Sequence, residues 1–427
     1  MPSVVVVGAQ WGDEGKGKIV DYLAEKSDIV VRYSGGSNAG HTVVVAGEEY
    51  KLRLLPSGIL HPGKLCVLAN GVALDAKVIL GEIEAINRRG IDTGNLRVSD
   101  RAHVIMPYHQ ALDKLQEEYK GAGKIGTTQS GIGPCYADKM ARTGIRVCDL
   151  MDEEIFAAKL KNCLAEKNLL LDKIYGAPGY DFAQVFAEYM EYARKLRPYV
   201  VDTGFLLARA MEGDKKIMYE GAQATFLDID HGSYPYVTSS NPIAGGVCTG
   251  AGVGPKSIGT VVGVVKAYST RVGEGPFVTE LSDEIGSHIR DRGQEYGTVT
   301  KRPRRCGWVD AAVVRYAAQL SGMDYLAITR LDILDQLPKV KICTGYSYKG
   351  RRIDYMPASL KELAKCQPLY EELPGWQADI SSAEKYGDLP ANARRYVERL
   401  SELSGAPLGI VSVGPGRTQT IVLADLL

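Results

Sequence analysis

A glycine-rich stretch, GDEGKGK at residues 12–18, directly follows the first hydrophobic run of the chain. Gly12, Gly17 and Lys18 fit the GxxxxGK spacing of phosphate-binding loops, whose backbone N–H groups converge on phosphate oxygens at a helix N-terminus. Ile19 replaces the usual Ser or Thr ligand of Mg²⁺, so the carboxylate of Asp13 is the candidate ligand for that ion. The motif predicts a nucleotide site; the alternative is a strand–helix turn without a ligand.

His41 ends a second glycine-rich turn, SGGSNAGH, which follows the hydrophobic run 29–33. Ligands of open parallel sheets bind at the carboxyl ends of the strands, so we expect this strand to neighbour the first and Asp13 and His41 to face one pocket. A carboxylate base and an imidazole acid together suit proton transfer. A lone histidine is more often structural, and that alternative stays open for His41.

Two later segments could recognise ligands. TRLD at residues 329–332 resembles the [NT]KxD tetrapeptide, in which a carboxylate accepts from N1–H and the 2-amino group of guanine and a cation lies on the purine face. SVGPGR at 412–417 follows the last predicted strand and could close over the base. GTVTKRPRR at 297–305 holds four cations, which suit a small dicarboxylate or a phosphate, or form a solvated basic loop.

The elements around these motifs predict an α/β fold. Short apolar strands are expected at 4–8, 29–33, 65–69, 217–219, 260–266, 325–329, 339–346 and 409–413, with a hairpin across 42–55. Helical patterns at 18–26, 75–89, 112–119, 309–320 and 391–401 alternate with them, and amphipathic helix fills 152–194 with a break at 176–179. We expect a large central, mostly parallel β-sheet flanked by helices, with inserted helical and hairpin subdomains, forming one unit over 1–427 with its helical insertion at about 100–200.

Composition excludes several classes of protein. The 51 basic and 51 acidic residues cancel, so no strong basic field is present and a nucleic acid partner is not expected. No apolar run approaches the roughly 18 residues of a membrane helix, and the N-terminus lacks the features of a signal peptide. The eight cysteines form no CxxC pair. We therefore expect a cytoplasmic protein with reduced thiols and no membrane partner.

Together, these segments resemble the adenylosuccinate synthetase family. The resemblance is carried by GAQWGDEGKGK, SGGSNAGHT, IGTTQSGIGPCYADKMAR, YEGAQATFLDIDHGSYPYVTSSN, KAYSTRVGEGPFVTE and SVGPGR, which occur in this order and span essentially the whole chain. It implies a P-loop-NTPase-like fold and a ligase that joins IMP to L-aspartate, cleaves GTP to GDP and phosphate, and passes through 6-phosphoryl-IMP. This is the first committed step from IMP to AMP.

The resemblance also implies roles for particular residues. Asp13 is the base at N1 of IMP and a Mg²⁺ ligand, His41 is the acid, and the Gly40 carbonyl is a second Mg²⁺ ligand; Lys16 and Gln223 complete the catalytic set. Arg142 matches an arginine that reaches IMP in the neighbouring subunit, which implies a homodimer. IMP contacts are implied for Asp13, Glu14, Gly15, Lys16, Asn38, Ala39, Gly40, His41, Thr128, Arg142, Gln223, Thr238 and Arg302.

The two other substrates are assigned in the same way. L-Aspartate contacts are implied for Thr298, Val299, Thr300, Lys301, Arg302, Pro303 and Arg304. GTP contacts are implied for Gly12, Asp13, Glu14, Gly15, Lys16, Gly17, Lys18, Gly40, His41, Thr42, Arg304, Arg330, Leu331, Asp332, Ser412, Val413 and Gly414.

The sequence departs from the family pattern at three positions. Arg330 stands where lysine is frequent, and arginine also stacks on a purine. Lys301 and Pro303 stand where glycine and arginine are common, and a proline restricts the loop and removes one N–H, which concerns aspartate binding and loop closure.

Two functions from other classes are alternatives. A GTPase switch would use the same phosphate loop and TRLD segment but would not need Asp13 and His41 together or the arginine-rich loop. A regulatory purine-binding protein without chemistry would not need to keep Asp13 and His41.

Overall fold

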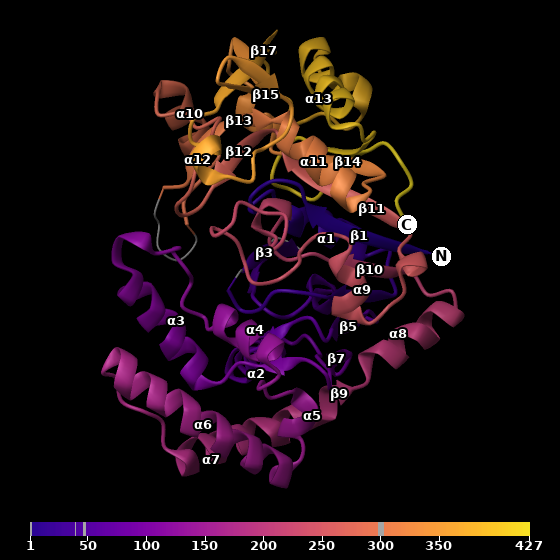
Figure 1. Cartoon of the computed structure of the whole chain (residues 1–427). Coiled ribbons are helices and arrows are strands. Elements are labelled where there is room, and N and C mark those ends of the chain that lie inside the picture. The colour runs from indigo at the N-terminus through magenta and orange to yellow at the C-terminus, as the bar shows by residue number, and fades with distance from the viewer. Residues whose placement is uncertain (1, 39, 46–47, 298–302) are drawn as a thin grey trace.

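The computed structural model describes residues 2–38, 40–45, 48–297 and 303–427. Its centre is a ten-stranded sheet, in which nine strands run parallel and the edge strand β19 is antiparallel to β18 (Figure 1). The expected α/β fold with a large, mostly parallel sheet is therefore confirmed. In spatial order the strands are β19 (Thr420–Val422), β18 (Leu408–Ser412), β14 (Tyr325–Thr329), β11 (Thr260–Lys266), β1 (Ser3–Gly8), β10 (Ile217–Glu220), β2 (Ile29–Arg32), β5 (Leu65–Leu68), β7 (Leu96–Ser99) and β9 (Val200–Val201).

The middle of this sheet is buried on both faces. Val4 to Val7 of β1 are completely buried, as expected for a run of β-branched residues between two layers of helices. Because the strands are parallel, the carboxyl ends of β1, β10, β14 and β18 meet at one edge. The loops after these strands therefore share one site.

One expected neighbour relation is wrong. The strand before His41 does not lie next to the first strand, because β10 from the middle of the chain is inserted between β1 and β2. The residues of β2 do not indicate which strand it pairs with, because its partner β10 lies almost two hundred residues further along the chain. The hairpin after this turn is confirmed, with β3 (His41–Val45) paired to β4 (Glu48–Leu52).

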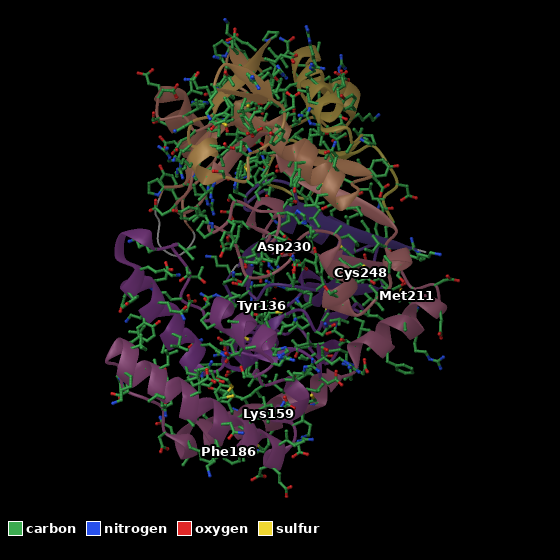
Figure 2. All side chains as sticks on the ribbon, viewed as in Figure 1. Tyr136, Lys159, Phe186, Met211, Asp230 and Cys248 are labelled. Atoms are coloured by element: carbon green, nitrogen blue, oxygen red, sulfur yellow. The ribbon has the colours of Figure 1, made fainter. Side chains whose placement is uncertain are left out.

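Helices cover the sheet, and α6 and α7 form a further layer beyond it (Figure 1). The predicted helix over 152–194 with a break is confirmed: α6 ends where Gly176 takes a left-handed φ of 60°, and α7 follows. Phe156 of α6 stacks on Phe186 of α7, and Figure 2 shows Phe186 in this outer layer. The helices are α1 (Lys16–Ala24), α2 (Ala76–Arg88), α3 (Pro107–Lys120), α4 (Ile132–Ala141), α5 (Val147–Leu150), α6 (Glu153–Tyr175), α7 (Phe182–Leu196), α8 (Thr203–Glu212), α9 (Gly246–Ala251), α10 (Glu284–Arg292), α11 (Ala311–Ser321), α12 (Leu360–Leu363) and α13 (Ala391–Ser404).

A smaller five-stranded sheet lies at the other end of the molecule from α6 and α7. It corrects one boundary: Val309 was expected in a helix, but it belongs to a strand, and the helix begins only after Asp310. The carboxylate of Asp310 accepts from the backbone N–H groups of Ala312 and Val313 and so caps α11. The strands of this smaller sheet are β12 (Tyr268–Arg271), β13 (Arg305–Asp310), β15 (Lys339–Tyr348), β16 (Arg351–Ile353) and β17 (Gln367–Pro374). The short strands β6 (Ala73–Leu74) and β8 (His103–Val104) pair with each other in a separate sheet.

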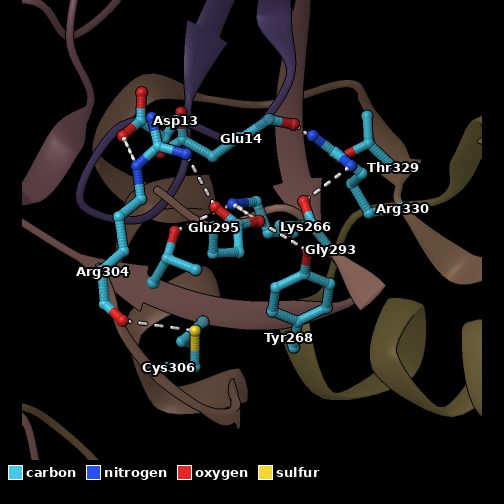
Figure 3. A network of polar contacts seen from close by, with 12 residues as sticks. Asp13, Glu14, Lys266, Tyr268, Gly293, Glu295, Arg304, Cys306, Thr329 and Arg330 are labelled. Atoms are coloured by element: carbon cyan, nitrogen blue, oxygen red, sulfur yellow. Dashed lines mark hydrogen bonds and ion pairs between the residues drawn. The ribbon is translucent and has the colours of Figure 1, made fainter. Parts of the chain in front are cut away.

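A buried ion pair joins the end of β11 to the segment that follows α10 (Figure 3). Nζ of Lys266, the last residue of β11, lies 2.7 Å from Oε1 of Glu295, which also accepts from the Tyr268 hydroxyl at 2.6 Å. Lys266 and Glu295 are 1% and 0% exposed. Burial alone would raise the pKa of the Glu295 carboxyl, but Lys266 and the Tyr268 hydroxyl hold it at about 2. Burial lowers the pKa of the Lys266 ammonium group, and the Glu295 carboxylate opposes this shift, so each group favours the charged form of the other.

We expect Glu295→Gln to lower the free energy of unfolding by about 3–5 kcal/mol, because it leaves the Lys266 ammonium buried without a counter-charge. Chemical denaturation of the variant and of the parent chain measures this difference. The double variant Glu295→Gln with Lys266→Met removes both charges and should recover part of the loss. Equal stability of Glu295→Gln and the parent would contradict the buried pair.

Candidate active site

A cavity of about 1140 Å³ opens at the carboxyl edge of the large sheet. Its walls come from the loops after β1, β2, β10, β14 and β18 and from the segment 125–137. Most of the residues predicted from the sequence line it, so the expectation that Asp13 and His41 share one pocket is confirmed. The predicted residues in its lining are Gly12, Asp13, Gly15, Lys16, Gly17, Lys18, Asn38, Gly40, His41, Thr128, Gln223, Thr238, Arg304, Arg330, Ser412 and Gly414.

The loop between β1 and α1 is shaped by the carboxylate of Glu14. This side chain is fully buried and accepts from the backbone N–H groups of Gln10 at 3.1 Å and Gly12 at 2.8 Å, and from Nζ of Lys16 at 2.5 Å. Although Glu14 was predicted among the ligand contacts, its side chain does not line the cavity. It holds the loop from inside.

Asp13 stands at the top of this loop in a strained backbone conformation. Its φ of 59° lies in the left-handed region, which a residue with a side chain rarely adopts. Its carboxylate is 40% exposed toward the cavity, and its Oδ2 lies 2.8 Å from Nε of Arg304. Gln223 and Arg330, two further residues of the lining, have φ values of 53° and 62°. Such strain concentrates at functional sites, where the surrounding structure imposes it.

Arg304 bridges two carboxylates (Figure 3). Besides the ion pair with Asp13, its Nη1 donates to Oε2 of Glu295 at 2.9 Å, and its backbone N–H donates to the Glu295 carbonyl at 2.8 Å. Tyr296 and Pro303 form an antiparallel bridge beside it. The described residues on either side of 298–302 are therefore paired with each other, and Arg304 on one side contacts Asp13 of the phosphate loop.

His41 is held by two residues that sequence reasoning missed. Its Nε2 lies 3.0 Å from Oγ of Ser57 and 3.5 Å from Oε1 of Glu220, and the Ser57 N–H donates to Oε2 of Glu220 at 2.9 Å. Burial lowers the pKa of His41, while the Glu220 carboxylate opposes this shift. The only sequence signal for Glu220 was its place at the end of a predicted strand; Ser57 had none.

The TRLD segment holds a carboxylate oxygen without a partner among the described residues, on Asp332, which does not itself belong to the cavity lining although Thr329 and Arg330 do. Asp332 follows β14, and within the part of the chain that the structure describes its Oδ1 is buried with no hydrogen-bond partner. Burial raises the pKa of this carboxyl, against the effect of the nearby Arg330. Nη1 of Arg330 donates to the Gly293 carbonyl at 3.1 Å, and the Thr329 hydroxyl donates to the Glu14 carbonyl. The segment is thereby joined to the phosphate loop.

Lys18 does not point toward the phosphate loop, although the GxxxxGK spacing suggested a phosphate contact. Its Nζ donates to Oγ of Ser412 and to the carbonyls of Gly414 and Gln419, at 2.7, 2.8 and 2.8 Å. Burial lowers its pKa to about 8, while Asp332 opposes the shift. The lysine is attached to the segment after β18.

On the opposite wall, Gln223 follows β10. Its Nε2 donates to Oδ1 of Asn38 at 3.2 Å, and its Oε1 is buried with no partner among the described residues. An orphaned acceptor in a cavity wall indicates a ligand that donates to it.

Several predicted residues lie elsewhere. Ala39, Thr298, Val299, Thr300, Lys301 and Arg302 lie outside the described residues. Pro303 and Arg142 are exposed, Arg142 at the end of α4, and neither belongs to the cavity lining; Leu331 and Val413 are buried in the core. Thr42 lies on β3.

Within the described residues, no group of three His, Cys, Asp or Glu side chains could hold a metal ion by itself. Among the helices described, none has the length and apolar character needed to cross a bilayer.

The chain is similar to known proteins over its full length. A sequence profile described as adenylosuccinate synthetase matches residues 5–421. The adenylosuccinate synthetases of Pelotomaculum thermopropionicum and Carboxydothermus hydrogenoformans are each 58% identical, over 426 and 423 residues, and cover 99–100% of both chains. The solved structure of the fully ligated Plasmodium falciparum enzyme superposes with a TM-score of 0.93 at 40% identity, covering 99% of this chain and 100% of that one.

A more distant structure shows the fold alone. It is the succinoaminodeoxyadenylate synthetase of cyanophage S-2L, with a TM-score of 0.60, 22% identity, and coverage of 99% of this chain and 95% of that one. The full-length matches, by contrast, extend over every loop of the cavity. The chain therefore belongs to the adenylosuccinate synthetase family, the ligases that form adenylosuccinate from IMP, aspartate and GTP in AMP biosynthesis.

Proposed function

We propose that the cavity performs this ligation through 6-phosphoryl-IMP, with Asp13 as the base. Removal of the N1 proton of IMP makes O6 nucleophilic, and O6 then attacks the γ-phosphorus of GTP as GDP leaves. The aspartate amine next attacks C6, the C6–O6 bond breaks, and phosphate leaves with O6. The observation that carries this assignment is the partly exposed Asp13 carboxylate, held at positive φ in the same cavity as His41.

His41 supplies a proton on the opposite side of the reaction centre. Ser57 and Glu220 hold one ring nitrogen, so the ring keeps a fixed orientation. The Glu220 carboxylate also favours the protonated imidazolium, against the burial that lowers the pKa. A donor fixed in this way stabilises the charge that develops on O6 and on the transferring phosphoryl group. Gln223 lines the same cavity as His41, and its side-chain amide can donate a hydrogen bond to the substrate or accept one from it.

The residues around Asp13 fit a Mg²⁺ ion. Mg²⁺ usually takes one or two carboxylates and completes its shell with water and substrate phosphates, so a cluster of three acidic side chains is not required. Asp13 offers a carboxylate oxygen to the cavity, and Gly40, which is exposed on the opposite loop, offers its carbonyl. When bound, the ion would neutralise charge on the phosphoryl oxygens.

The substrates divide the cavity between them. Lys16 and the loop amides from Gly12 to Lys18 serve the phosphates of GTP, and the partnerless Oδ1 of Asp332 accepts from guanine beside Arg330 and the segment 412–414. Asn38, Thr128, Gln223 and Thr238 surround IMP. The loop 298–304 binds L-aspartate, with Arg302 and Arg304 recognising its carboxylates.

A homodimer completes the site. Arg142 is exposed and outside the lining of its own cavity, although the family resemblance assigns it to IMP, so it would act on a neighbouring subunit. The two ends of the chain, from the phosphate loop to residues 412–414, line one cavity, which supports a single functional unit over 1–427. The cytoplasmic location is proposed from membership of the family alone.

We expect Asp13→Asn to reduce adenylosuccinate formation by about 10²–10⁴-fold, the range for loss of a general base. IMP binding should stay measurable by calorimetry, because the amide keeps the size of the side chain. A variant with near-normal turnover would remove Asp13 from the role of base.

The dimer is tested by mixing two inactive variants, Asp13→Ala and Arg142→Leu. If Arg142 serves the neighbouring site, mixed dimers contain one site with both residues intact, and activity should reappear on mixing. Each variant incubated alone is the control. Mixtures that remain as inactive as the separate variants, although hybrid dimers form, would show that Arg142 does not act across an interface.

A further inference from the structure

Lys18 makes contacts that its place in the phosphate-loop motif does not explain. It lies in the first turn of α1, and each of the three hydrogens of its ammonium group has an acceptor in the segment 412–419. These acceptors lie 394 to 401 residues away in the sequence. The ammonium group is thus fully engaged by one loop.

That loop forms a compact turn around the ammonium group. The Val413 N–H donates to the Gln419 carbonyl at 3.0 Å, the Gly416 N–H donates to Oε1 of Gln419 at 2.8 Å, and the Ser412 hydroxyl donates to the Gly414 carbonyl at 3.2 Å. The Gln419 side chain packs so closely on Gly414 that a Cβ there would lie 2.4 Å from its Cδ. Carbonyls that point inward in this way need a donor at the centre, and Lys18 supplies it.

Lys16, two residues earlier, has different side-chain partners from Lys18. It begins α1, its side chain is 13% exposed, and within the part of the chain that the structure describes its ammonium group contacts one polar group, the Glu14 carboxylate of the phosphate loop. Its ammonium group keeps hydrogens for a ligand. Lys18 would have to abandon three hydrogen bonds to reach a phosphate oxygen.

We propose that Lys18 is a positioning residue for recognition of the purine base: it fixes the segment 412–419 against the cavity beside Asp332, and it does not serve as a phosphate ligand. The inference rests on the proposed GTP site. Ser412 and Gly414 line the cavity on the side of Arg330, so the loop that Lys18 organises is the one able to cover the base. The lysine therefore links the phosphate loop to base selectivity through α1.

The test uses a ligand without phosphates. Guanosine binding, measured by calorimetry, and the ratio of kcat/KM for GTP over ITP, which lacks the 2-amino group, are compared for the parent enzyme, Lys18→Met and Lys16→Met. We expect Lys18→Met to weaken guanosine binding about tenfold or more and to reduce the GTP-over-ITP ratio. Lys16→Met, the matched control, should leave guanosine affinity and the ratio unchanged while lowering kcat.

A second variant separates loss of the proposed role from a folding defect in Lys18→Met. Gln419→Ala keeps Lys18 but removes the side chain that packs on Gly414, and it should weaken guanosine binding in the same direction. Normal guanosine affinity and an unchanged ratio in Lys18→Met, together with weakened GTP binding, would overturn the proposal and return Lys18 to the phosphates. A parent enzyme that did not prefer GTP to ITP would instead refute the assigned base site itself.

Discussion

The geometry of the site depends on one buried charge, the carboxylate of Glu14. It lies inside the loop after β1, takes hydrogen bonds from two backbone N–H groups and from Lys16, and leaves the rest of the loop facing the cavity. A buried carboxylate is stable only with such partners. The space around it is fully used: a Cβ on Gly8 would lie 2.5 Å from its Oε2, so only glycine fits where the strand enters the loop.

Contacts of the phosphate loop that Glu14 holds together also fix the position of two other segments of the cavity wall. The Thr329 hydroxyl donates to the Glu14 carbonyl and thereby sets the TRLD segment beside the loop, while Arg304 joins Asp13 to Glu295, which pairs with Lys266 at the end of β11. Asp13 consequently has a cationic partner before any substrate arrives. In the proposed mechanism, proton transfer from IMP and metal binding would both compete with that pair, so Arg304 would connect the aspartate loop to the first chemical step.

Much of this site could be predicted from the sequence, because its glycine turns and charged residues follow apolar strands directly. Asp13, His41 and Arg330 were placed correctly at the carboxyl edge of a parallel sheet. The sequence could not show that β10 separates β1 from β2, because strand order depends on non-local pairing. The sequence also did not indicate the roles of Glu295, Lys266 and Ser57, because these roles depend on partners that only the fold brings together. The predicted helix included Val309, but the helix starts after the Asp310 cap.

In the proposed reaction, Asp13 and His41 make O6 of IMP a nucleophile toward GTP. The fate of this oxygen atom can be followed by supplying the enzyme with IMP labelled with ¹⁸O at O6, GTP, Mg²⁺ and L-aspartate, and by examining the released phosphate by mass spectrometry. The phosphate should carry the ¹⁸O label in proportion to the adenylosuccinate formed. Unlabelled phosphate with the label released to water would contradict phosphorylation at O6 and with it the roles assigned to both residues.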